Sequence, residues 1–177
     1  MSIKSFLANA GIAFVLCLFF IVDTSAQSTQ ARAICPGTKL TAAEEKALID
    51  GHNAIRKELS LRDLIWDCTL AKAAQSWADR GIAEHDDDNP YGESIFVASS
   101  GTADVTGSLK RWQTEKANWT NETGTCAPGK ICLHYTQIVW RTTAKLGCGI
   151  NRNATGKWKT MLVCNYDPAG NTGGKAY

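Results

Sequence analysis

LHYTQIVW at residues 133–140 is followed by LGC at 146–148 and by VCNYDPAGN at 163–171. The first stretch places His134 beside a run that is too apolar and aromatic for a loop. Each later stretch places a cysteine, Cys148 or Cys164, in an apolar segment typical of a β-strand. We therefore expect a disulfide-cross-linked domain that exposes the imidazole of His134. We expect the functional site near that side chain.

The first 26 residues are typical of an export signal. Lys4 supplies a positive charge, an apolar run extends from Gly11 to Val22, and small residues precede a cleavage point after Ala26. The apolar run is shorter than the ~20 residues that span a bilayer, which disfavours a membrane anchor. We predict a signal peptide over residues 1–26, a mature chain without a transmembrane segment, and secretion (to the periplasm if the source is bacterial).

The mature chain has the size and charge of a single extracellular domain. Residues 27–177 suit one compact core. The formal net charge is +2, and the signal removes one charge of each sign, so no polyanion partner such as nucleic acid is expected. Polar, small residues over 27–40 predict a mobile leader, and the domain is expected over 41–177.

Six cysteines remain after the signal, and this even number in an exported chain predicts three disulfides. Cys126 and Cys132 enclose a short loop that closes easily. Cys148 and Cys164 pair if their two strands are neighbours, and elimination then joins Cys35 to Cys68. Three sequons provide glycosylation candidates if the host glycosylates: Asn118, Asn121 and Asn153.

The pattern of caps and apolar residues predicts helices first and a small sheet later. Thr41 and Glu44 form a capping box, and Asp67 can cap a second helix that ends at Gly81. The remaining elements are expected as a strand at 92–97, a helix at 104–119, a loop at 120–131, a short helix at 135–138, and strands at 146–151 and 160–165. This order predicts an α+β layered domain.

Two histidines and two glutamates could carry chemistry: His85, Glu93, Glu115 and His134. If they meet, imidazoles and carboxylates could form a metal site or an acid/base cluster. They lie on four different elements, so spacing alone does not show that they meet.

Each of these residues also has a purely structural interpretation. His85 could be a solvated histidine in an acidic loop, and Glu115 could pair with Arg111 one helical turn earlier. His134 could bond backbone amides at the start of a helix, and His52 could serve the first helix alone.

The motifs together resemble those of the cysteine-rich secretory, antigen five and pathogenesis-related superfamily. HYTQIVW at 134–140 and CNYDPAGN at 164–171 resemble its two long signatures, and HNAIR at 52–56 and YGES at 91–94 resemble two shorter ones. The resemblance covers about residues 40–171. It differs from the usual pattern at Asp86, Ser94 and Leu133, where the family has Ser, Asn and Gly.

The resemblance implies a three-layer α-β-α sandwich in a single domain stabilised by disulfides. It also implies a cleft that holds His85, Glu93, Glu115 and His134. The two histidines would hold zinc or another divalent cation weakly, because two protein ligands give modest affinity. Tyr135 and Gln137 would lie beside the cleft as hydrogen-bonding groups. The last residues, 168–177, resemble the signalling peptide that plant members release.

The function that we expect is a secreted binding protein rather than an enzyme. Its ligand would be a sterol or fatty acid, or an extracellular protein, and its role defence, virulence or host interaction. No catalytic residue is assigned, because the six mature cysteines are explained as bridges. Two alternatives remain open: a metal-dependent extracellular peptidase, and a surface-interaction protein with a vestigial cleft.

Overall fold

The computed structural model describes residues 35–177, so the predicted signal peptide and the predicted leader up to residue 34 lie outside the described residues. The helices are α1 (Ala42–Lys57), α2 (Cys68–Arg80), α3 (Val105–Thr114), the 3-10 helix η1 (Glu115–Asn118) and α4 (Leu133–Ile138). The strands are β1 (Ile65–Trp66), β2 (Gly92–Ala98), β3 (Trp119–Thr120), β4 (Thr125–Cys126), β5 (Lys145–Asn151) and β6 (Thr160–Asp167). Over these residues, no helix has the length and apolar character that crossing a membrane requires.

The predicted caps begin the first two helices. The Thr41 hydroxyl accepts from the Glu44 amide, and the Glu44 carboxylate accepts from the Thr41 amide at 2.8 Å. The carboxylate of Asp67 accepts from the first amides of α2, which ends at Gly81 in the left-handed conformation. Local hydrogen bonds therefore fix where both helices start, as the sequence predicts.

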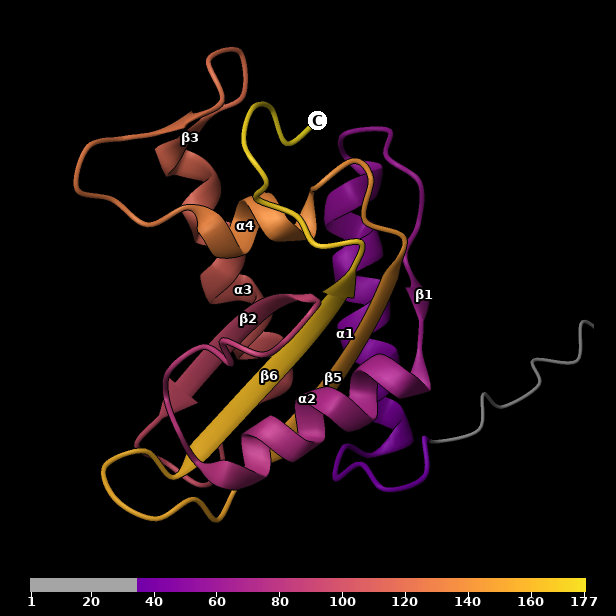
Figure 1. The fold of residues 1–177 in the computed structure, drawn as a ribbon, viewed down its shortest axis with the longest axis vertical. Coiled ribbons are helices and arrows are strands. Elements are labelled where there is room, and N and C mark those ends of the chain that lie inside the picture. Colours follow the sequence, from indigo (N-terminus) through magenta and orange to yellow (C-terminus); the bar gives the residue numbers. More distant parts are fainter. Residues whose placement is uncertain (1–34) are drawn as a thin grey trace, which may run out of the picture. The chain divides into compact units, whose positions relative to one another are not determined.

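The central sheet separates two layers of helices (Figure 1). Its strand order is β1-β5-β6-β2, with β6 antiparallel to both β5 and β2. Alternate residues of β6 face opposite sides: Met161 and Val163 pack with α2, whereas Leu162 and Tyr166 pack in the core that α1, α3 and α4 share. This is the predicted α-β-α sandwich.

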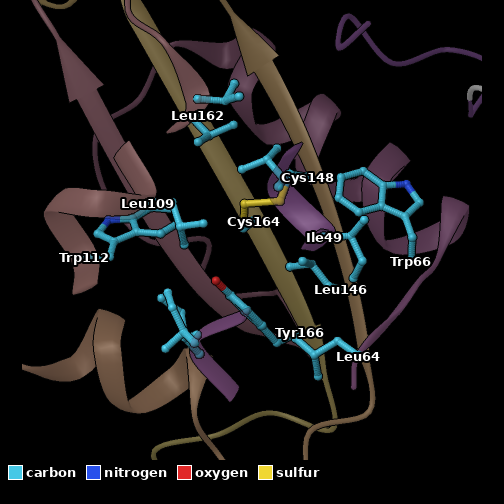
Figure 2. Close-up of a cluster of buried hydrophobic side chains, with 14 of the residues drawn as sticks. Ile49, Leu64, Trp66, Leu109, Trp112, Leu146, Cys148, Leu162, Cys164 and Tyr166 are labelled. Carbon is cyan, nitrogen blue, oxygen red and sulfur yellow. A yellow bond between two sulfur atoms is a disulfide. The ribbon is translucent and has the colours of Figure 1, made fainter. Parts of the chain in front are cut away.

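Close packing on both faces depends on small and apolar residues of β5. A Cβ atom added at Gly149 would lie 2.3 Å from the backbone of Gln75, so only glycine lets α2 approach the strand this closely. On the opposite face, Leu146 and Cys148 lie near Ile49 of α1, in the same buried cluster as Leu109 and Trp112 of α3 (Figure 2).

All three predicted disulfides form: Cys35–Cys68, Cys126–Cys132 and Cys148–Cys164. The last pair lies directly opposite in the register of β5 and β6. Residues 35–40, which the sequence assigned to the leader, pack against the domain. The side chains of Cys35 and Leu40 are buried, and the Lys39 amide donates to the Gln75 side chain at 2.9 Å.

Three short elements differ from the sequence-based expectation. The helix predicted at 104–119 is an α-helix only to Thr114 and continues as η1. The predicted loop at 120–131 contains one strand of the β3–β4 hairpin, and β1 was not predicted. Each of these strands has two residues, which is too short for a hydrophobic period to appear in the sequence.

Arg56 joins α1 to the end of α4. Its side chain is buried and its guanidinium donates to four carbonyl oxygens, those of Arg62, Ile138, Trp140 and Thr143. Burial and the charge of Arg62 lower the pKa of Arg56 to about 10, so it stays charged at neutral pH. The positive charge lies at the C-terminal end of α4, where backbone carbonyls lack helical partners.

His52 contacts residues outside the first helix, so the interpretation that it stabilises that helix alone is wrong. Its ring is buried, with Nδ1 2.7 Å from the Leu48 carbonyl oxygen and Nε2 3.0 Å from the Tyr166 hydroxyl. A carbonyl oxygen only accepts, so neutral His52 carries its proton on Nδ1 and accepts from Tyr166 at Nε2. Burial raises the pKa of Tyr166, which keeps that hydroxyl a donor. The pair ties α1 to β6.

The glycosylation candidates differ in how their side chains are used. The side-chain nitrogen of Asn121 donates to the Tyr177 carbonyl oxygen. Its side-chain oxygen accepts from the backbone amides of Ala176 and Tyr177. Asn118 donates to the Ile131 carbonyl oxygen, whereas Asn153 is exposed. Asn121 therefore holds residues 176–177 against the domain.

Replacing Arg56 with methionine is expected to lower the free energy of unfolding by about 3–5 kcal/mol, because buried carbonyl oxygens lose their donors. Urea unfolding at neutral pH measures this. The control is Arg62→Met, at an exposed position whose carbonyl is unchanged. Equal stability of Arg56→Met and Arg62→Met would show that the buried guanidinium contributes nothing.

Acid is expected to destabilise the fold through His52. Burial lowers the pKa of His52 from its ordinary value of 6.5 to about 4. Between these pH values the unfolded chain binds a proton that the folded chain does not, so stability falls as pH falls, by about 3 kcal/mol from this residue.

Urea unfolding at pH 7 and pH 4 measures the loss. His52→Gln should lose about 3 kcal/mol less than the wild type over this range. An unchanged pH dependence in His52→Gln would contradict the assignment.

Candidate functional site

The first histidine–glutamate pair joins the loop after α2 to the start of β2. His85 Nδ1 lies 2.7 Å from Glu93 Oε1. The Glu93 side chain is only 5% exposed, whereas that of His85 is 65% exposed. Glu93 also accepts from the Asp86 amide and the Asn89 side chain. His85 is therefore a solvated loop histidine, as one interpretation predicted, but a buried carboxylate orients its ring.

The second pair joins η1 to the start of α4. His134 Nδ1 lies 2.7 Å from Glu115 Oε1, and Glu115 Oε2 accepts from the backbone amides of His134 and Tyr135. The His134 ring stacks on Trp112, with 5.6 Å between ring centroids and 7° between planes. The interpretation that His134 bonds backbone amides at the helix start is wrong, because its ring Nδ1 and its own backbone amide both donate to the Glu115 side chain.

The alternative that Glu115 pairs with Arg111 is wrong. Over residues 35–177, no carboxylate lies within ion-pair distance of the Arg111 guanidinium. The Glu115 carboxylate instead binds the start of α4. One oxygen accepts from the His134 imidazole, and the other accepts from a backbone amide that has no helical partner.

The two pairs share one chemical arrangement. In each, a carboxylate accepts from Nδ1–H, which fixes the tautomer of the neutral ring and leaves Nε2 with its lone pair free. A carboxylate behind an imidazole also holds the ring in the orientation that a metal ligand needs. Each pair can thus offer one nitrogen ligand.

The start of β2 and α4 lie against each other. A Cβ atom added at Gly92 would lie 2.2 Å from Gln137 Oε1, so the strand and the helix approach each other closely here. Glu93 follows Gly92, and His134 lies one turn before Gln137. Among the described residues, however, no group of three or more His, Cys, Asp or Glu side chains could hold a metal ion. A metal ion held by these residues would therefore have two protein ligands at most.

Tyr135 and Gln137, predicted beside the cleft, have buried side chains. Gln137 Oε1 accepts from the Gly170 amide at 2.9 Å and its Nε2 donates to Thr143, so the side chain fastens the chain after β6 to α4. Burial raises the pKa of Tyr135, so its hydroxyl stays protonated. Both residues support α4 from the protein interior.

Sequence reasoning did not assign Trp112 to the site. A signal was present, because Trp112 lies one turn before Glu115 and both therefore emerge on one side of the helix. Its stacking holds the His134 ring from the side that Glu115 does not contact.

Comparison with known proteins agrees with this architecture. Residues 49–166 match the model of the cysteine-rich secretory protein family, CAP. Pathogenesis-related protein 1A1 of Solanum lycopersicum is 39% identical over 127 residues, which are 70% of each chain.

Solved structures agree as well. The crystal structure of NaASP2 with Zn²⁺ matches with a TM-score of 0.69 and 25% identity over 81% of this chain and 90% of that one. Venom allergen-like protein 4 of Schistosoma mansoni matches with a TM-score of 0.65 and 25% identity over 78% and 95%. The family match, the relative and the two structures together show that this chain belongs to the CAP family of cysteine-rich secretory proteins.

Proposed function

We propose that this protein is an extracellular defence protein that acts by binding, and that His85 and His134 together hold a divalent cation. The observation that carries the proposal is the 2.7 Å contact between Nδ1 and a glutamate oxygen in each pair. The disulfides support an extracellular location. The similarity to a plant pathogenesis-related protein supports the defence role.

The chemistry of the donors fits a weakly held cation. Two neutral imidazoles, completed by water or an anion, suit the tetrahedral preference of zinc. NaASP2, a structural neighbour, was crystallised with Zn²⁺. The contact between Gly92 and Gln137 supports a shared site, because it holds the two elements that carry Glu93 and His134 together. The glutamates would orient the ligands, and no further protein ligand is assigned.

An apolar ligand is a second candidate, and Leu133 favours it. Where the family pattern has glycine, this chain places a leucine whose side chain is 59% exposed. Leu133 borders a hollow of about 120 Å³ with Trp119 and Trp140. Ligand pockets commonly measure ~300–1,000 Å³, so this hollow suits part of an acyl chain better than a whole sterol.

Zinc binding is expected to depend on both histidines. By isothermal titration calorimetry, His85→Ala and His134→Ala should each weaken Zn²⁺ binding by at least about tenfold, and Glu93→Gln or Glu115→Gln by about 10–100-fold. Binding should weaken as pH falls, because a protonated imidazole cannot ligate a metal.

The matched control for zinc binding is Asp87→Asn, which removes an exposed charge beside His85 without touching either pair. It should bind zinc like the wild type. If only one of the two histidine variants loses zinc, the pairs act separately and the shared site is wrong.

Radiolabelled palmitate is expected to bind the purified protein saturably. Leu133→Gly should weaken that binding by about threefold or more, since losing even ~30 Å² of buried apolar contact costs about 0.7 kcal/mol. The exposed Ile65, on β1, provides the control Ile65→Gly, which should bind normally. Failure of both palmitate and cholesterol to bind would remove the lipid candidate.

A further inference from the structure

Strand β2 forms an edge of the central sheet. It pairs with β6 over Gly92–Ala98, and in residues 35–177 no other strand pairs with its second side. An antiparallel edge strand directs about half of its backbone N–H and C=O groups outward. This side of β2 therefore offers a row of donors and acceptors at the spacing of a strand.

A hollow of about 520 Å³, here called the edge groove, follows β2. Residues 95–99 line it in succession. Successive side chains of a strand point to opposite faces, so a hollow on one face of the sheet would touch only alternate residues. Contact with consecutive residues places the groove along the strand edge. Its other walls come from Arg111, Trp112, Glu115, Ile131, His134 and Trp158.

The edge groove carries uncompensated positive charge at one end. A second hollow, of about 550 Å³, shares Arg111, Glu115 and Ile131 with it and adds Lys130. Among the described residues, neither Arg111 nor Lys130 has a carboxylate within ion-pair distance. The nearby Glu115 carboxylate is already bonded to His134 and two amides. Two cations are thus free to pair with an incoming anion.

We propose that the edge groove binds an extended acidic peptide segment of a partner protein, which adds a strand to the free side of β2. Backbone hydrogen bonds to residues 95–99 would supply affinity, and the acidic side chains would pair with Arg111 and Lys130. Apolar side chains of the segment would pack on Phe96 and Trp158. A lipid has no amides at strand spacing, so the groove favours a peptide.

The segment is short. Five residues of a strand extend for about 17 Å at ~3.4 Å per residue, so a peptide of that length covers the lined part of β2. The proposal goes beyond cation binding and does not need it, because neither Arg111 nor Lys130 belongs to a histidine–glutamate pair.

The test uses the intact protein with EDTA and a terminally blocked, fluorescent heptapeptide in which valine and aspartate alternate. Fluorescence anisotropy should show saturable binding. Replacing aspartate with lysine, or methylating alternate backbone nitrogens, should each weaken binding at least tenfold. Amide NMR shifts should concentrate in residues 95–99.

Matched variants test whether Arg111 and Lys130 bind the acidic side chains of the peptide. The double variant Arg111→Gln and Lys130→Gln should weaken binding at least tenfold, whereas Lys110→Gln, an exposed neighbour on α3, should not. Four results would overturn the proposal: no binding at millimolar peptide, equal binding of the lysine peptide, no effect of N-methylation, or amide shifts centred elsewhere. Because EDTA is present, loss of the zinc site would leave these results unchanged.

Discussion

The buried guanidinium of Arg56 is the interaction on which the site depends. It gathers carbonyl oxygens from the end of α4 and from the chain that follows, and it fastens them to α1. Since α4 has only six residues, it has little stability of its own. Its position, and therefore the position of His134 at its start, is set by contacts such as this one.

Because helices cover both faces of the central sheet, they limit which parts of the sheet a ligand can reach. Helix α2 occupies one face, and α1, α3 and α4 occupy the other, so neither face is available to a ligand (Figure 1). The edge at β2 and the loops around it remain accessible. Both histidine–glutamate pairs involve these segments, since Glu93 lies on β2 and His134 borders the edge groove. Cation binding and peptide binding would thus use neighbouring surfaces.

Local signals predicted much of the fold, because caps, turns and short disulfide loops are encoded by adjacent residues. The capping box at Thr41 and the Cys126–Cys132 bridge are examples. Contacts across long sequence separations had no such signal. The bond between His52 and Tyr166 spans 114 positions, and nothing in the helix pattern marks it. The residue types alone made the four site residues candidates, and the resemblance implied that they meet in one cleft. The structure adds that each histidine is held by a glutamate.

The central claim is that these two pairs, fixed on separate elements, present their Nε2 atoms to one ion. A crystal soaked in zinc and measured at the zinc absorption edge tests it directly. The account predicts a single anomalous peak about 2.0–2.1 Å from Nε2 of both His85 and His134. Two separate peaks, or one peak bound to a single imidazole, would contradict it.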